Sequence, residues 1–204
     1  MSYLVTSPCV VILAGGQSKR LGSPKQLLQV EGTTLLERTI AAAQELGDGP
    51  VVVVLGAHAE LILPEVTQAG IEVILNPDWQ EGMAASLRAG IRHVGARHPQ
   101  IDGILFLVCD QPFLKADLLK ELTNLQASAD LPVAACRYGD RLGTPALFHQ
   151  SVFSLLLDLK GDTGARKLLE GMVEQVAILD FEKGIYDIDT REDYERLLTY
   201  KNIL

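Results

Sequence analysis

Cysteine is scarce in this sequence, with only three residues in 204: Cys9, Cys109 and Cys136. They lie far apart and never form a C-x-x-C pair, so they indicate neither a disulfide framework nor a zinc site. A chain of this length can bury a substantial core without such crosslinks. The cysteine pattern therefore favours a reducing compartment, and we expect a cytoplasmic protein.

Positive charge is also in short supply. The sequence has 18 Lys and Arg residues against 26 Asp and Glu residues, which gives a formal net charge of −8. Binding to a phosphate backbone requires a clustered excess of basic residues, so we expect no nucleic-acid partner. A polyanionic small molecule could bind only where positive charge is concentrated locally.

Long apolar runs are missing as well. No window approaches the roughly 18 consecutive apolar residues of a membrane span, and Pro8 interrupts the apolar stretch near the N-terminus. We therefore expect no membrane partner. Aromatic residues make up only 5% of the chain, whereas hydrophobic residues make up 48%. Many of these are Val, Ile, Leu and Ala, which is typical of a sheet covered by helices on both faces.

Short apolar runs rich in β-branched residues alternate with amphipathic stretches. The predicted strands are Cys9 to Ala14, Val51 to Leu55, Ile71 to Leu75, Ile104 to Val108, Pro132 to Cys136 and Val176 to Asp180. The predicted helices are Thr34 to Leu46, Met83 to Val94, Lys115 to Ala127 and a last one from about Thr190. This alternation predicts an α/β fold, a Rossmann-like three-layer αβα sandwich with a mostly parallel sheet. We expect one domain spanning residues 1–204, with a loop-rich stretch from Tyr138 to Phe148 and two helical segments after it.

The first predicted strand runs into a glycine-rich turn, A-G-G-Q-S-K-R-L-G-S-P-K over residues 14–25. Its glycines permit close backbone approach to a ligand, and successive N–H groups in such a turn can surround phosphate oxygens. Lys19, Arg20 and Lys25 supply local positive charge, and no acidic residue accompanies them. The spacing fits neither a Walker A loop nor the dinucleotide-binding fingerprint. The alternative is an ordinary strand-to-helix turn with a solvated basic face.

Asp110 follows the predicted strand that ends at Val108, and Pro112 enforces a turn directly after it. Ligands of open α/β sheets bind beyond the carboxyl ends of the strands. Mg²⁺ prefers one or two carboxylates together with substrate phosphates and water. Asp110 is therefore a candidate Mg²⁺ ligand, and the alternative is that it caps the following helix.

The segment L-A-G-G-Q-S-K-R-L-G-S-P-K-Q-L-L resembles the L-A-x-G-x-S-x-R-[ML]-G-x-x-K-x-L-L signature of the molybdenum cofactor nucleotidyltransferases and related sugar-nucleotide pyrophosphorylases. The resemblance implies a nucleotide-diphospho-sugar transferase-like fold, in which about residues 1–137 bind the nucleotide and about residues 138–204 bind the acceptor. It also implies that Arg20 and Lys25 are catalytic and neutralise charge developing on the α-phosphate and pyrophosphate. The nucleotide-binding residues that it implies in this loop are Leu13, Ala14, Gly15, Gly16, Ser18 and Gly22.

Two further segments extend the resemblance to a metal centre. C-D-Q-P-F is similar to the family's D-x-P motif, which implies that Asp110 is catalytic and binds Mg²⁺. D-I-D-T-R-E-D is similar to the family's D-I-D-T-P-E-D, although Arg191 replaces the proline. Asp187 and Asp189 fall on the same side of an extended segment. One of them can therefore be the second metal ligand while the other caps the last helix, and the sequence leaves open which.

A fourth segment concerns the nucleoside. N-P-D-W-Q-E-G-M-A-A-S-L-R-A-G is similar to the N-P-x-W-x-x-G-M-x-x-S-L-x-x-G of the cytidylyltransferase branch. This implies that Gly82 and Ser86 border the nucleoside, with the backbone around Gly82 reading the base edge. The alternative keeps Trp79 as a hydrophobic anchor and Ser86 as a solvent-facing helix residue, and we favour the anchor role for Trp79.

The acceptor side is represented by G-T-P-A-L-F and G-D-T-G-A-R, which look like two further segments of the family. They imply acceptor-binding roles for Gly143, Pro145, Gly164 and Arg166. Arg166 stands at a predicted helix start, where a phosphate group can meet both amides and a guanidinium. The alternative is that Asp162 and Arg166 merely pair across one helical turn.

The resemblance implies transfer of a nucleoside monophosphate from a Mg²⁺-bound nucleoside triphosphate to a phosphorylated, molybdopterin-type acceptor, with release of pyrophosphate. Most segments favour CTP, whereas the L-A-G-G sequence matches the guanylyltransferase branch and favours GTP. A sugar-1-phosphate nucleotidyltransferase would share the first loop and Asp110. A non-catalytic accessory protein that escorts cofactor to a molybdenum hydroxylase apoenzyme would retain the same loop, so both alternatives stay open.

Overall fold

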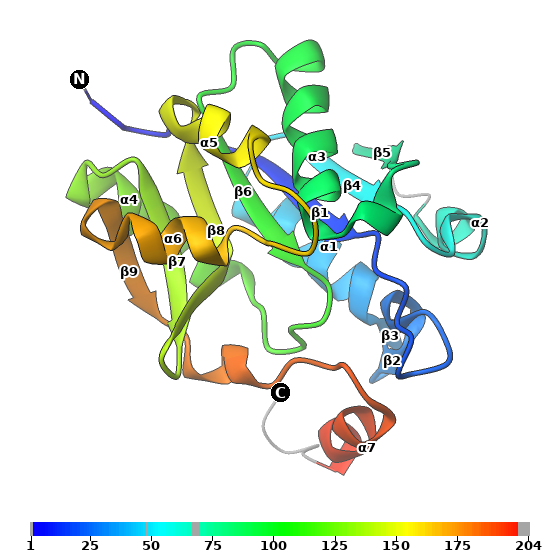
Figure 1. Ribbon diagram of the computed structural model, residues 1–204. Coiled ribbons are helices and arrows are strands. Elements are labelled where there is room, and N and C mark those ends of the chain that lie inside the picture. The colour runs from blue at the N-terminus through cyan, green and yellow to red at the C-terminus, as the bar shows by residue number, and fades with distance from the viewer. Residues whose placement is uncertain (1, 48, 67–69, 200–204) are drawn as a thin grey trace.

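The computed structural model describes residues 2–47, 49–66 and 70–199, and a seven-stranded sheet runs through its centre (Figure 1). The strand order is β5-β4-β1-β6-β8-β7-β9. The strands are β1 (Cys9–Ala14), β4 (Val51–Leu55), β5 (Ile71–Leu75), β6 (Gly103–Val108), β7 (Val133–Tyr138), β8 (Arg141–His149) and β9 (Val176–Asp180). Only the two pairs that involve β8 are antiparallel. The mostly parallel sheet confirms the predicted α/β fold class.

Helices cover both faces of this sheet. They are α1 (Leu35–Leu46), α2 (Ala59–Ile62), α3 (Met83–Arg97), α4 (Ala116–Ala129), α5 (Phe153–Leu157), α6 (Arg166–Gly171) and α7 (Arg191–Thr199). Helices α1 and α4 pack together on one face, while α3, α5 and α6 lie on the other (Figure 1). Within the described ranges, no helix combines the length and apolar character that crossing a bilayer requires.

Strand β1 shows how the sequence produces the three layers. All six of its residues are buried, and alternate side chains of a strand point to opposite faces. Val10 and Ile12 belong to the core beneath α1 and α4, whereas Val11 and Leu13 belong to the core beneath α3. A continuous apolar run is therefore what a strand buried on both faces requires.

The prediction of a loop-rich stretch from Tyr138 to Phe148 is wrong. The chain turns at Gly139, which has a φ of 58°, and returns as the nine-residue strand β8 between β6 and β7. The ladder between β7 and β8 jumps from Ala135↔Ala146 to Cys136↔Gly143, so Thr144 and Pro145 stand outside it. Proline is tolerated in a sheet at such an irregularity, and its presence is what concealed the strand in the sequence.

Two smaller features also lie outside the sequence-based expectations. A hairpin of β2 (Gln29–Val30) and β3 (Thr33–Thr34) follows the glycine-rich loop, and the short helix α2 follows β4. Both are too short to give a periodic hydrophobic pattern. The carboxyl ends of β1, β4, β5 and β6 meet at one edge of the sheet, where the candidate site residues gather.

The edge strand β5 is tied to α3 by a glutamate between two histidines. The two carboxylate oxygens of Glu72 each lie 2.6 Å from an imidazole Nε2, one of His93 and the other of His98. Partial burial opposes ionisation, but the two histidine contacts prevail and lower the pKa of Glu72. The carboxylate therefore joins the sheet edge to the last turns of α3.

We predict that Glu72→Gln lowers the free energy of unfolding by about 1 kcal/mol near pH 6, on the scale of a partly exposed ion pair. The folded-state pKa of Glu72 is lowered, so its contribution is complete above the ordinary glutamate pKa of about 4.3 and is lost as the pH falls further. Chemical denaturation at several pH values measures this difference. The exposed Glu45→Gln is the matched control, and an equal effect of both substitutions would contradict the prediction.

Candidate functional site

The glycine-rich loop after β1 is fixed by two polar side chains. Gln26 is fully buried, and its Nε2 donates to the carbonyl oxygens of Ala14 at 2.7 Å and Gly16 at 3.2 Å. Ser18, with a left-handed φ of 52°, accepts the Lys25 amide hydrogen on its Oγ at 3.0 Å. Both ends of the loop are thus anchored, which orders its N–H groups before a ligand arrives.

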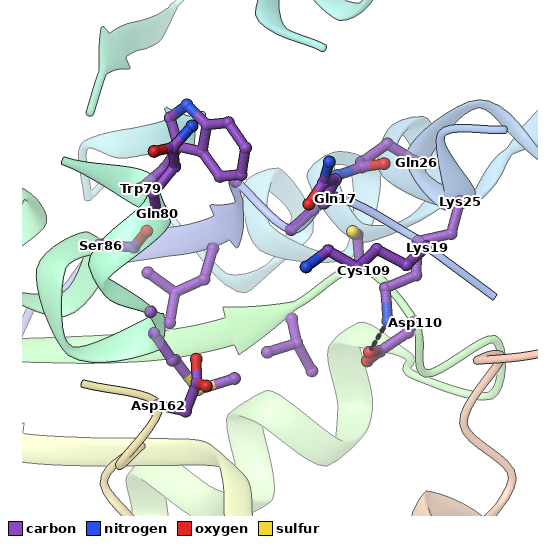
Figure 2. A pocket seen from close by; sticks show the side chains of 16 residues that line it. Gln17, Lys19, Lys25, Gln26, Trp79, Gln80, Ser86, Cys109, Asp110 and Asp162 are labelled. Carbon is purple, nitrogen blue, oxygen red and sulfur yellow. Dashed lines mark hydrogen bonds and ion pairs between the residues drawn. The ribbon is translucent and has the colours of Figure 1, made fainter. Parts of the chain in front are cut away.

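The Lys25 ammonium lies between two carboxylates. Its Nζ is 2.5 Å from Asp110 Oδ2 and 3.0 Å from Asp189 Oδ1, and Figure 2 shows the contact with Asp110. Arg20 donates to the second oxygen of Asp189 at 2.7 Å. This cluster joins the predicted catalytic residues Arg20, Lys25 and Asp110 to Asp189, so it contains two of the predicted metal ligands.

The electrostatics of the cluster favour its charged form. Burial alone would lower the pKa of Lys25, but the negative charge of Asp110 and the hydrogen bonds raise it overall. Burial alone would raise the pKa of Asp189, but Lys25 and Arg20 hold it below its usual value. The contacts are therefore ion pairs, and the partly buried ones among them are only weakly screened by solvent.

The segment that carries Asp187 and Asp189 is tied to Asp110 through the backbone. The Ile188 N–H donates to the Asp110 carbonyl at 3.0 Å, and the Ile188 side chain is buried. Burial and repulsion from Asp110 and Asp189 raise the pKa of Asp187. Asp187 therefore lies in the electrostatic field of Asp110.

The start of α7 departs from the expectation that Asp187 or Asp189 caps it. The Asp193 N–H donates to Thr190 Oγ1 at 3.2 Å, and Asp193 Oδ2 accepts the Thr190 N–H at 2.9 Å. This reciprocal pair satisfies the helix N-terminus as a capping box does. Asp110 is likewise not a cap, because α4 begins six residues later and Lys115 precedes it.

The carboxylates fit a divalent metal that is shared with a ligand. Within the described ranges, no three His, Cys, Asp or Glu side chains converge closely enough to hold a metal alone. Mg²⁺ needs only one or two carboxylates when phosphates and water complete its shell. Asp110 and Asp189 contact the same ammonium, and the raised pKa of Asp187 marks a carboxylate that a cation would stabilise.

A cavity of about 350 Å³ opens beside this cluster. Figure 2 shows Trp79 and Ser86 on one side of it and Lys25 and Asp110 on the opposite side. Its lining includes seven of the predicted site residues: Leu13, Gly15, Gly16, Lys25, Gly82, Ser86 and Asp110. The cavity therefore has one end at Lys25 and Asp110 and another near Trp79 and Ser86, on whose side Asp162 lies.

The segment between α5 and α6, which holds Gly161 and Asp162, forms part of the cavity wall. The Gly161 carbonyl accepts the Ala84 N–H at 3.1 Å, and Asp162 lines the cavity. Arg88 reinforces this contact by donating to the Leu159 carbonyl at 2.6 Å. At Gly82, which has a φ of 117°, a side chain would collide with Asp162 and the Gly161 backbone. The glycine is thus required by close packing as well as by its backbone conformation.

The predicted acceptor residues are placed unequally. Gly143 packs against the Tyr138 side chain, and Pro145 follows Thr144, whose carbonyl accepts from Gln111 Nε2 at 3.0 Å. This segment is therefore joined to the residue after Asp110. Gly164 lies against Met83, which lines the cavity.

Arg166 lies apart from the cavity lining. Its Nε donates to Glu170 at 2.7 Å along the exposed face of α6, with 52% of the Arg166 side chain accessible. The alternative pairing of Asp162 with Arg166 is wrong, because Glu170 takes that role. The Arg166 side chain is therefore paired with Glu170 and does not line the cavity.

The solvent-facing alternative for Ser86 is also wrong. Ser86 is 6% exposed and its Oγ accepts a hydrogen from Asn76 Nδ2 at 3.1 Å. Trp79 packs against Gly56, as an anchor would, and it also lines the cavity. Reasoning from the sequence missed Asn76 and Gln26, although both lie within the segments that carry the resemblance. Buried amides of this kind leave no signal in hydrophobic patterning.

Comparison with known proteins agrees with this arrangement. The model of the MobA-like NTP transferase domain matches residues 10–177. The nicotine blue oxidoreductase of Paenarthrobacter nicotinovorans is 33% identical, covering 94% of this chain and 97% of its own. The molybdenum cofactor cytidylyltransferase of Escherichia coli K12 is 29% identical, covering 90% and 92%. The crystal structure of the Mycobacterium tuberculosis H37Rv protein Rv0371c in complex with manganese is 30% identical, covers 96% of this chain and 100% of that one, and has a TM-score of 0.78.

The matched region holds the glycine-rich loop, Asp110 and the wall around Ser86, which line the cavity, while Asp189 of the ion-pair cluster lies beyond that region. The fold, the sequence match and the resemblance of the separate segments all indicate the same family. The chain belongs to the family of proteins with a MobA-like NTP transferase domain.

Proposed function

We propose that the protein transfers a nucleoside monophosphate from a metal-bound nucleoside triphosphate, with CTP preferred, to a phosphorylated pterin of the molybdopterin type. The observation that carries this proposal is the convergence of Lys25, Arg20, Asp110 and Asp189 at one end of a cavity that extends to Trp79 and Ser86. Such a cavity can hold a charged triphosphate at the cluster and the base beside Ser86.

In the proposed reaction, an oxygen of the acceptor's terminal phosphate attacks the α-phosphorus in line with the leaving group. A bond forms between this oxygen and the α-phosphorus, the bond to the β-phosphate oxygen breaks, and pyrophosphate leaves with the electron pair. A divalent cation, when bound, supplies charge neutralisation and orientation of the phosphates. Asp110, with Asp187 or Asp189, would hold it.

Phosphate binding and charge neutralisation also depend on this chain's own groups. The ordered N–H groups of the loop would bind phosphate oxygens, and Lys25 and Arg20 would neutralise the charge that develops on the transferred and leaving phosphates. No side-chain nucleophile is needed. Catalysis then consists of positioning and electrostatic stabilisation.

The acceptor and base are proposed from the relatives. One relative is named a molybdenum cofactor cytidylyltransferase, and the segment around Gly82 and Ser86 resembles that branch. The most similar relative reported above is named an oxidoreductase, so family membership alone does not set the reaction. Release of pyrophosphate from CTP in the presence of molybdopterin would support the transferase, whereas nucleotide binding without pyrophosphate release would favour an accessory role.

For the metal centre, we predict that Asp110→Ala abolishes metal-dependent turnover while the protein stays folded, because the side chain contributes charge more than core packing. At least one of Asp187→Ala and Asp189→Ala should behave in the same way. Turnover at several Mg²⁺ concentrations, with circular dichroism as the folding control, measures this. Wild-type rates for Asp110→Ala would refute the assignment, and near-normal rates for both other variants would place the second ligand elsewhere.

For the basic cluster, Lys25→Ala and Arg20→Ala should each lower kcat/KM by about 10² or more, the scale of losing one preorganised oxyanion donor. Steady-state kinetics over a range of CTP concentrations give the values. Lys120→Ala removes a positive charge on α4, where Lys120 Nζ lies 4.0 Å from Asp117, and serves as the control. If kcat/KM of both cluster variants stays within about twofold of the wild-type value, Lys25 and Arg20 are only solvated surface charges.

For the base, Gly15→Ala should shift the kcat/KM ratio further towards CTP, with measurable GTP use in the wild type. A Cβ at Gly15 would lie 3.2 Å from Ser86 Oγ and 3.4 Å from the Gly56 nitrogen, so a methyl group there narrows the cavity. One methyl changes discrimination by about 1–3 kcal/mol. A competition assay with both triphosphates measures the ratio, and an unchanged ratio would assign base choice to other residues.

A further inference from the structure

Asn76 follows β5 directly and is almost fully buried, with 4% of the residue exposed. Its side-chain oxygen accepts the Asp78 N–H at 3.1 Å. A backbone N–H can only donate, so this contact fixes which end of the amide is the oxygen. The Nδ2 group must then face Ser86, whose Oγ lies 3.1 Å away.

This hydrogen bond determines what the Ser86 hydroxyl can offer. A serine hydroxyl has one hydrogen to donate and lone pairs to accept with, and the Asn76 hydrogen occupies an accepting position. In the part of the chain that the structure describes, no acceptor takes the Ser86 hydrogen. Ser86 lines the cavity, so its hydroxyl is left as a donor for a ligand there.

Gly15 leaves space beside this donor. A Cβ at position 15 would lie 3.2 Å from the Ser86 oxygen. Because glycine has no side chain, the cavity beside the hydroxyl stays wide enough for a purine as well as for a pyrimidine. The width at Gly15 therefore does not by itself select the base, and the polarity of the Ser86 hydroxyl, which Asn76 orients, can.

We propose that Asn76 determines base specificity by making Ser86 a hydrogen-bond donor. This rests on the proposed function, because it assigns the end of the cavity near Ser86 to the base. The pairing edge of cytosine presents two acceptors, N3 and O2, beside the N4 amino donor, whereas that of guanine presents two donors, N1–H and N2–H, beside the single acceptor O6. A donor on the wall therefore finds acceptors at more positions of cytosine, and where it faces N1–H or N2–H of guanine both donors stay unpaired, which is costly when buried. Asn76 is a positioning residue, since it acts through Ser86.

The substitution Asn76→Asp inverts this polarity at nearly constant volume. An aspartate has no hydrogen to give, so its free oxygen accepts the Ser86 hydrogen, and the Ser86 lone pairs turn towards the cavity. The wall then accepts where it donated before, which suits guanine better than cytosine. The added negative charge weakens both triphosphates through their phosphates, and the Ser86→Ala background separates its direct effect on the bases from the effect of the Ser86 polarity.

The test is isothermal titration of CTP and of GTP, each with Mg²⁺, into the wild type, Asn76→Asp, Ser86→Ala and the double variant. The wild type should bind CTP more tightly, and Asn76→Asp should move the ratio of dissociation constants towards GTP by about tenfold, the worth of one hydrogen bond to a buried polar group. Ser86→Ala should reduce the wild-type preference. In the Ser86→Ala background, Asn76→Asp should no longer change the ratio.

Asn124→Asp adds the same charge at an exposed position of α4 and should leave the ratio unchanged. Thermal melting checks that each variant is folded, and Ser86→Ala tests the inference even if Asn76→Asp does not fold. An unchanged ratio in Asn76→Asp and Ser86→Ala, or the same shift with and without the Ser86 hydroxyl, would overturn the inference while leaving the proposed function intact. A wild type that binds neither triphosphate would contradict both.

Discussion

The arrangement of the site depends on one ammonium group held between two carboxylates. Lys25 comes from the loop after β1, Asp110 from the end of β6 and Asp189 from the segment before α7, and the ion pairs join these distant parts of the chain. With 15% and 19% of the Lys25 and Asp110 side chains exposed, screening by salt is limited. Breaking such a pair would leave one charge partly buried and unpaired, which is strongly unfavourable. The cluster therefore fixes the mouth of the cavity as well as its charge.

Buried amides and hydroxyls fix the rest of the cavity. Gln26 spans the ends of the glycine-rich loop, and Asn76 orients Ser86 on the opposite wall. Polar groups with this many committed partners have little freedom to reorient when a ligand binds. A site of this kind can stabilise a phosphoryl transition state by geometry and charge, because the cost of ordering its donors was met during folding.

Much of the fold could be predicted from the sequence, because buried parallel strands and amphipathic helices leave different periodic patterns. Strand β8 could not, since Gly143 and Pro145 signal a loop unless their place outside the ladder is known. The resemblance assigned Arg20, Lys25 and Asp110 to one site, and the structure places them in one ion-pair cluster with Asp189. It could not reveal that Asp193 with Thr190, and not Asp187 or Asp189, caps α7, because all three aspartates are equally suited to capping. Nor could it indicate that Glu170 engages Arg166, since that choice depends on side-chain geometry along α6.

The proposed reaction transfers the α-phosphate of the bound triphosphate, with its nucleoside, to the acceptor. A single-turnover reaction tests this most directly, with CTP labelled at the α-phosphate in one sample and at the γ-phosphate in another, each with molybdopterin and Mg²⁺. The α-label should appear in the pterin product and the γ-label in pyrophosphate, in equal amount. Label that stays in CTP, or an α-label released as free CMP without a pterin product, would contradict it.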